Sequence, residues 1–329
     1  MRPVRRLWAD LTRTADEFEP RGRPLAAGRT LLALASGCLL ALSPDQALFP
    51  RTAGVTDGPV CDGIGRLSMW CLAESGGVNL LVCRVIALVV LTLVALGYRP
   101  RWTCVPHWYV TYSLSVTMAL PDAGEQVIRI LTLLLIPICL ADDRRWQWRR
   151  PARPLPAAWR GRAYAAQLFV RVLGVTIYAE ASLSKLAVPA WRDGTAGYYW
   201  LVHQHYGSAL AVQPPLGTVL HDRIGVSVVT WGALAVELTL ALCLFGSGRV
   251  RRTGWALAVS MHGAIALLMG FTTFAMTMAG LWAIVCAGAG RPRATEARTG
   301  LDSPAAYPKP GTALGERSQD REQPDSGQF

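Results

Sequence analysis

Charged residues are scarce in this sequence, and lysine is almost absent from it. Asp, Glu, Lys and Arg make up only 17% of the 329 residues, whereas about a quarter is usual for soluble domains. The signatures of several soluble enzyme classes are also missing, namely the phosphate-binding loop, Gly-x-Ser-x-Gly and His-Glu-x-x-His. Eight cysteines are too few for a small scaffold built on disulfides. These absences argue against an ordinary soluble domain and against those enzyme classes.

Apolar residues make up 52% of the chain and occur in long blocks. A block of about 20 residues is long enough to cross the hydrocarbon core of a bilayer as a helix. The sequence therefore predicts an all-α polytopic helical bundle in the cell membrane, with about eight transmembrane helices. The expected stretches are Leu25–Ser43, Val78–Gly97, Cys104–Leu120, Gly124–Ala141, Ala163–Leu186, Arg223–Phe245, Thr253–Phe271 and Phe274–Gly290.

The basic residues predict the orientation of these helices. Arginines precede the first stretch and fill every second connection, including seven between the fourth and fifth stretches. Because basic loops stay in the cytoplasm, both termini are expected there. The net charge of +11 is then a topology signal and a contact for anionic lipid. Nucleic acid is not an expected partner, because the arginines are split among short loops.

Composition divides the chain into three parts. Residues 1–24 form a basic cytoplasmic segment, and residues 25–290 form the transmembrane domain. Residues 291–329 are rich in Gly, Pro, Ser and charge, which predicts a disordered cytoplasmic tail.

The eight cysteines fall into two groups. Six lie inside expected helices, where a thiol behaves as a small apolar group. Cys61 and Cys71 share the first outer loop, the only oxidising space that holds cysteines. We expect a structural disulfide between them; the alternative is a redox-active pair that acts on another protein.

Ionisable residues within the expected helices mark candidate functional positions, because a charge inside a bilayer is costly. Matching depths predict an inner cluster of Arg171, Glu237 and His262 and an outer match of Arg84 with Glu180. Glu125 and Arg129 are spaced to pair within one helix. The alternative is that these groups only hold helices together. The full set is Arg29, Arg84, Arg129, Arg171, Glu180, Lys185, Glu237 and His262.

Lys185 is the most unusual of these residues. The chain has 33 basic residues, and only Lys185 and Lys309 are lysines. Arg171, Tyr178 and Lys185 lie seven residues apart, on one polar helix face that must meet protein, water or a polar ligand. An amine can lose its proton when it is desolvated, whereas a guanidinium cannot, so Lys185 is a candidate general base. The alternative is that Lys185 extends to the outer membrane interface.

Two sets of motifs carry a resemblance to known families. The first runs Tyr178-Ala-Glu-Ala-Ser-Leu-Ser-Lys185-Leu186, then Trp191-Arg-Asp-Gly194-Thr195, then Tyr198-Tyr199-Trp200, with Glu237 and His262 later in the chain. It resembles the horizontally transferred transmembrane domain, a membrane domain that is also found in vitamin K-dependent gamma-carboxylase. That resemblance implies that Lys185 matches the lysine base of vitamin K epoxidation. The chain departs from the carboxylase in having only a tail beyond the membrane part, and in reading Ser-Leu-Ser-Lys where the family has Gly-Leu-x-Lys.

The second set covers about Gly28 to Gly290. It comprises Gly28-Arg29, the Cys61 and Cys71 pair, Gly97-Tyr-Arg-Pro-Arg-Trp102, His107-Trp-Tyr-Val-Thr-Tyr-Ser113, Asp122-Ala-Gly-Glu-Gln126, Leu131-Thr-Leu-Leu-Leu-Ile-Pro137 and Asp143-Arg-Arg-Trp-Gln-Trp148. In this order the motifs resemble the sporulation-delaying protein B family, a bacterial branch of the same superfamily. The resemblance implies a role beside a secreted peptide toxin and a small partner protein.

These observations give three functional hypotheses. The first is a membrane factor that matures an exported antimicrobial peptide. In this hypothesis Lys185 is the base, and the protein binds either the peptide substrate or a quinone-like cofactor. The second is a non-catalytic chaperone or assembly factor, and the third is a thiol–disulfide or quinone-linked oxidoreductase. His203-x-His205 alone is no zinc signature, and no metal site is expected. Residues expected to bind substrate or stabilise charge are Arg84, Arg171, Tyr178, Glu180, Trp191, His203, His205, Glu237 and His262.

Overall fold

The computed structural model describes residue 9 and residues 11–49, 58–118, 123–203, 207–208 and 213–288. The tail predicted over residues 291–329 lies outside the described residues. The described chain is helical and contains no strand, apart from one isolated bridge between Tyr98 and Trp146. The helices are α2 (Arg23–Leu42), α3 (Asp45–Leu48), the 3₁₀ helix η1 (Gly63–Leu67), α4 (Met69–Ser75), α5 (Leu80–Leu96), α6 (Pro100–Thr117), α7 (Ala123–Cys139), α8 (Ala157–Ala187), α9 (Pro189–Arg192), α10 (Ala196–Val202), α11 (Gln213–His221), α12 (Arg223–Cys243), α13 (Gly248–Met269) and α14 (Thr272–Val285).

Each of the eight apolar stretches corresponds to one long helix, namely α2, α5, α6, α7, α8, α12, α13 and α14. Three of these, α2, α8 and α12, are long and apolar enough to cross a membrane, and α5 and α14 are shorter apolar helices. The all-α class predicted from the sequence is therefore confirmed. The number of spans and the cytoplasmic position of both termini remain predictions.

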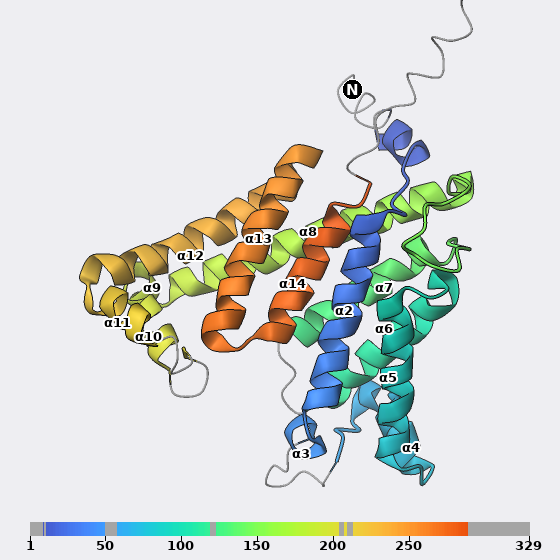
Figure 1. The fold of residues 1–329 in the computed structure, drawn as a ribbon, viewed down its shortest axis with the longest axis horizontal. Coiled ribbons are helices and arrows are strands. Elements are labelled where there is room, and N and C mark those ends of the chain that lie inside the picture. Colours follow the sequence, from blue (N-terminus) through green and yellow to red (C-terminus); the bar gives the residue numbers. More distant parts are fainter. Residues whose placement is uncertain are drawn as a thin grey trace, which may run out of the picture. The chain divides into compact units, whose positions relative to one another are not determined.

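The centre of the fold is the contact between α2 and α14, which lie side by side in Figure 1, with α5 on the other side of α2. Glycine makes the close approach possible, as is common where membrane helices pack. A Cβ atom on Gly28 would lie 2.5 Å from Cγ1 of Ile284 and 2.9 Å from the carbonyl oxygen of Gly280. Only a residue without a side chain fits there.

A buried polar network joins α2 to α6 and to the segment after α7. Arg29, which is 1% exposed, donates hydrogen bonds to Oε1 of Gln147 at 2.7 Å and to Oγ1 of Thr103 at 3.2 Å. The Gln147 amide in turn donates to the carbonyl oxygen of Ala26 and to Oγ1 of Thr30. These contacts make Arg29 a structural tie between helices.

A second tie fixes the segment before α2. Arg21 and Glu19 form an ion pair at 2.7 Å, and the backbone N–H of Leu155 donates to the same carboxylate at 2.8 Å. Burial alone would raise the pKa of the Glu19 carboxyl, but these hydrogen bonds hold that pKa below its usual value. The Glu19 carboxylate thus stabilises the link between the N-terminal segment and the connection that leads to α8.

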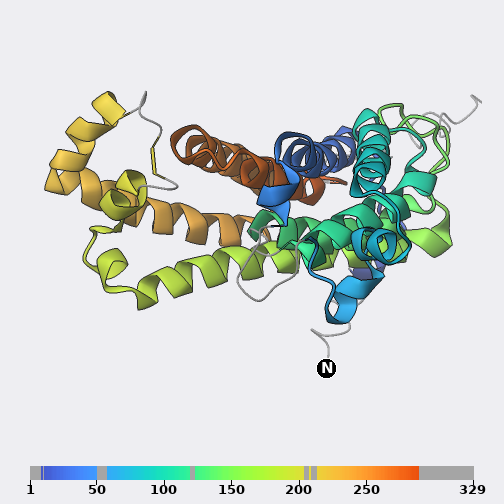
Figure 2. The same ribbon diagram turned by 90° about the horizontal axis from the view of Figure 1, so that it is seen from below.

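Helix α8 and the helices after it form the part of the fold that holds the candidate site. In Figures 1 and 2, α12 runs alongside the second half of α8, and these helices are in contact. The short helices α9 and α10 follow α8 and lie against the first half of α12. A Cβ atom on Gly194, whose φ is +77°, would lie 2.9 Å from Oγ of Ser227 and 3.0 Å from Nε1 of Trp231. The N–H of Gly197 donates to Oγ1 of Thr230 at 2.8 Å.

Candidate functional site

Lys185 and Glu237 form the centre of the candidate site. Nζ of Lys185 on α8 lies 2.5 Å from Oε1 of Glu237 on α12. Oγ of Ser182 donates to the other carboxylate oxygen at 3.2 Å. Ser182 and Lys185 meet the same carboxylate because residues three apart share a helix face. The lysine side chain is 24% exposed and the glutamate side chain 12%, so this ion pair is largely shielded from solvent.

Trp191 on α9 completes the surroundings of the amine. Its ring centre lies 5.4 Å from Nζ of Lys185, within the range of a cation–π interaction. The proline that begins α9 cannot continue the α8 ladder, so the chain turns just after Lys185 and places the indole beside it. The ammonium therefore has a carboxylate and an aromatic ring as neighbours.

A buried aromatic group extends the site about two helical turns along α8 from Lys185. Tyr178, which is 2% exposed, accepts a hydrogen bond from Nε1 of Trp282 at 2.9 Å. Its ring centre lies 6.0 Å from the ring of His262. Lys185 lies within electrostatic range of His262, as Glu237 does of Tyr178. The structure thus gathers five of the predicted residues: Tyr178, Lys185, Trp191, Glu237 and His262.

His262 has a defined hydrogen-bond arrangement. Its Nδ1 lies 2.8 Å from the carbonyl oxygen of Ala258 on the same helix, and a carbonyl oxygen can only accept, so Nδ1 carries the proton. The ring of Phe274 packs at 5.4 Å between ring centres. His262 is 3% exposed and is held in one orientation, with Nε2 left as the proton acceptor of the neutral ring.

The predicted inner cluster of Arg171, Glu237 and His262 is wrong in one member. Helix α8 begins at Ala157, six residues earlier than expected. Arg171 precedes Lys185 by 14 residues on α8, a separation of about 21 Å along the helix axis. Because Glu237 pairs with Lys185, Arg171 lies far from that carboxylate and instead within electrostatic range of Arg251.

The predicted match of Arg84 with Glu180 is also wrong. Arg84 on α5 pairs with Asp45 of α3 at 3.1 Å and donates to the carbonyl oxygen of Ser43. It therefore fastens α5 to the C-terminal end of α2. Glu180 is exposed on α8. Similar depth in the membrane does not place two residues side by side unless their helices pack together. Helix α5 packs mainly against α2 and α6, and α8 is not among its main neighbours.

The predicted histidine pair is only partly described. His203 is exposed at the C-terminal end of α10, and His205 lies outside the described residues. Within the described part of the chain, no group of three or more His, Cys, Asp or Glu side chains could hold a metal ion.

Cys61 and Cys71 are joined by a disulfide in the structure, with Cα atoms 5.7 Å apart. Cys71 lies in the first turn of α4, where its N–H is capped by Oγ of Ser68 at 3.2 Å. The bond closes the segment that carries η1 onto α4. The structural role of this disulfide stays a prediction, and a redox-active role is the alternative.

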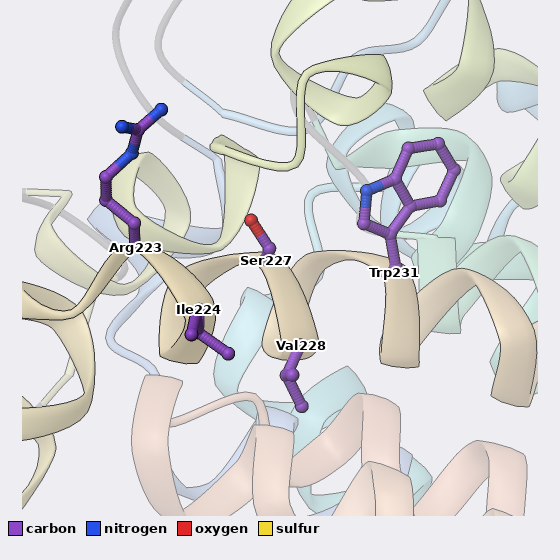
Figure 3. Close-up of a pocket in the computed structure, with 5 residues that line it drawn as sticks. All are labelled: Arg223, Ile224, Ser227, Val228 and Trp231. Carbon is purple, nitrogen blue, oxygen red and sulfur yellow. The ribbon is translucent and has the colours of Figure 1, made fainter.

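A shallow groove lies along the first turns of α12, close to the α9–α10 segment. Figure 3 shows its lining, which consists of Arg223, Ile224, Ser227, Val228 and Trp231, with a volume of about 370 Å³. The lining includes neither Lys185 nor Glu237. A quinone-like molecule that filled only this groove would therefore be lined by neither residue of the ion pair.

Sequence reasoning missed Ser182 as a partner of Glu237 and Trp282 as a donor to Tyr178. Spacing gave a signal for Ser182, which lies three residues before Lys185. Trp282 gave none, because its contact joins α14 to α8 across 104 residues of sequence.

The chain is similar to two curated proteins of Bacillus subtilis (strain 168). It is 31% identical to the uncharacterized protein YitO over 267 residues, which is 81% of this chain and 85% of YitO. It is 27% identical to the sporulation-delaying protein SdpB over 248 residues, which is 75% of this chain and 76% of SdpB. No protein-family model matches the chain, and no solved structure matches it significantly.

Proposed function

We propose that the chain is a multi-pass cell-membrane protein needed to mature an exported peptide of the sporulation-delaying type. The chain belongs to the family of YitO, and its similarity extends to SdpB. The observation that carries the proposal is the similarity to SdpB over three quarters of both chains. Its proposed partners are the membrane, the peptide precursor and a small protein of the same system. We also propose that the chain is a member of the superfamily that includes the vitamin K-dependent carboxylase.

Within this function, the Lys185–Glu237 pair is the proposed chemical centre. An ammonium that donates to a carboxylate can pass its proton from Nζ to Oε1, which leaves a neutral amine beside a neutral acid. The low dielectric of a shielded site favours such a neutral pair more than water does. The amine then accepts a proton from the substrate and becomes an ammonium again, and Glu237 later gives its own proton to the product, which restores the ion pair. Ser182 holds the carboxylate in place during both transfers.

The other gathered residues have positioning roles in this proposal. Trp191 stabilises the ammonium form through its ring face and so sets the state from which the cycle starts. Tyr178 and His262 form a rigid, buried wall next to the pair, held by Trp282 and by the Ala258 carbonyl. Arg84 and Arg171 have no part in it, since each lies elsewhere in the fold.

A specific observation favours a second candidate, the non-catalytic chaperone or assembly factor. The Lys185–Glu237 ion pair joins α8 to α12, and this link between helices is sufficient for a purely structural role. The oxidoreductase alternative depends on Cys61 and Cys71, which form a disulfide.

The test compares the secreted peptides of the organism that encodes this chain with those of a strain that lacks it, by mass spectrometry. The deletion is complemented with wild type, Lys185→Arg or Glu237→Gln. Arg192→Gln is the matched control, because Arg192 is an exposed basic residue on α9. Base chemistry predicts that wild type and Arg192→Gln restore the mature mass and that Lys185→Arg does not, although its protein level is normal.

Other outcomes separate the candidates. Full maturation with Lys185→Arg would refute the base and leave the chaperone. Failure only with Cys61→Ser or Cys71→Ser, at normal protein levels, would favour the oxidoreductase. An identical set of secreted peptides with and without the chain would overturn the proposed function itself.

A further inference from the structure

Two arginines lie within electrostatic range of each other where α8 passes the turn between α12 and α13. Arg171 lies on α8, and Arg251 lies in the first turn of α13. Each is only partly exposed, and the Nε atom of each is buried without a hydrogen-bond partner. Arg251 donates one bond, from Nη1 to the carbonyl oxygen of Gly246 at 2.6 Å. Arg171 has no hydrogen-bond or ion-pair partner among the described residues.

No carboxylate compensates this pair within the described part of the chain. The groups within electrostatic range of the two guanidiniums are Tyr164, Cys286 and the guanidiniums themselves. Two like charges that are partly removed from water repel each other and lose hydration. The arrangement is therefore unfavourable unless an anion binds between them.

We propose that Arg171 and Arg251 bind the phosphate group of an anionic phospholipid. A guanidinium donates two parallel hydrogen bonds to phosphate oxygens, which a charged but rounder ammonium does not. The Tyr164 hydroxyl supplies a further donor beside them. The inference rests on the membrane location that is part of the proposed function, but not on chemistry at Lys185, which lies about 21 Å away along α8.

The surroundings favour a lipid over free phosphate as the source of this group. The α12–α13 turn carries large apolar side chains that are well exposed: Leu242 at 77%, Phe245 at 67% and Val250 at 41%. Acyl chains would cover such side chains, and a free anion would not. Basic pockets between helices at the cytoplasmic side of a membrane are known positions for lipid headgroups, and the sequence places this turn on that side.

The test measures thermal unfolding of the full chain in nanodiscs of phosphatidylcholine, alone or mixed with phosphatidylglycerol. We expect phosphatidylglycerol to raise the Tm of wild type by about 2–4 °C. Arg171→Gln and Arg251→Gln should lose that rise. Arg252→Gln is the matched control, because Arg252 is the exposed neighbour of Arg251 and its loss changes net charge equally.

The decisive comparison is Arg171→Gln in a maltoside detergent, which contains no phosphate group. There the variant should be at least as stable as wild type, because it removes an uncompensated charge. A lower Tm than wild type in that detergent would overturn the proposal, since Arg171 would then be compensated within the protein. An equal rise with phosphatidylglycerol in wild type, Arg171→Gln and Arg252→Gln would also overturn it, because only net charge would matter.

Two further measurements complete the design. Arg171→Lys keeps the charge and should fold while showing a smaller rise with phosphatidylglycerol. Inorganic phosphate added to the protein in the maltoside detergent identifies the source. If it raises the Tm of wild type as much as phosphatidylglycerol does, and leaves the Tm of Arg171→Gln unchanged, the phosphate site is supported and its ligand is a free anion.

Discussion

Removal of the Lys185 charge should destabilise the protein, and removal of both partners should cost less than the sum. Lys185→Met leaves a Glu237 carboxylate that is 12% exposed and retains only Ser182 as a donor. Breaking a fully buried pair costs about 3–5 kcal/mol and breaking an exposed pair about 0–1 kcal/mol. For this partly exposed pair we expect a loss of about 2 kcal/mol, reduced from the buried value because solvent reaches the amine.

Glu237→Gln keeps an amide oxygen that can accept from Lys185, so its cost should be about 1 kcal/mol. In Lys185→Met/Glu237→Gln neither charge remains, and we expect a coupling of about 1 kcal/mol between the two changes. Thermal unfolding in detergent or nanodiscs measures all three variants, and Arg192→Gln should leave Tm unchanged. Strictly additive losses, or a higher Tm for Lys185→Met, would show that the ion pair does not tie α8 to α12.

Three further predictions concern stability. Cys61→Ser should cost about 2–3 kcal/mol, because its bond to Cys71 restrains the unfolded chain; a reducing agent should lower the Tm of wild type to that of the variant and leave the variant unchanged. Gly28→Ala should cost about 1–3 kcal/mol by overpacking α2 against α14, whereas Gly263→Ala, where a Cβ would have nothing within 4 Å, should not lower Tm. Glu19 has a lowered pKa in the folded state, so its stabilisation is present above the pKa of the unfolded carboxyl, about 4.3, and is lost as pH falls through the folded value. As pH falls from neutral to about 3, below the unfolded pKa, the Tm of wild type should therefore fall more than that of Glu19→Gln; equal falls would show that this carboxylate is not the group that titrates.

The long helices were predictable because apolar length is a local property of the sequence. Each predicted stretch overlaps one helix, but the ends differ: α8 begins at Ala157 instead of Ala163, and α14 ends at Val285 instead of Gly290. Arg160 and Arg162 interrupt the apolar pattern before Ala163, although these residues continue the same helix. The short helices α3, α4, α9, α10 and α11 were not predicted, since none has the apolar length that marks a membrane span.

The candidate site was predictable as a set of residues but not as a set of pairs. A lone lysine among arginines identified Lys185, and mid-helix position identified Glu237 and His262. Which of these residues pair depends on how far α8 and α12 are displaced along each other. That displacement is set by tertiary packing, and it cannot be obtained by counting residues from helix ends that are themselves uncertain. Contacts within one helix, such as Ser182 with Lys185, are fixed by helical periodicity and could be read directly.

The shift between α8 and α12 also decides how a substrate reaches the amine. Glu237 lies 14 residues after Arg223 and six before Cys243 on α12, so its ion pair lies well away from the Arg223 end of that helix. The first half of α12 is covered by the α9–α10 segment, through the close contact of Gly194 and the hydrogen bond of Gly197 to Thr230. A peptide that approaches from the Arg223 end must therefore pass or displace this segment before it meets Lys185. The groove at Trp231 lies at this first half of α12, and Trp191 of the same segment has its ring 5.4 Å from the amine. Movement of α9 and α10 would therefore be needed for a peptide that enters from this end to reach the proposed base.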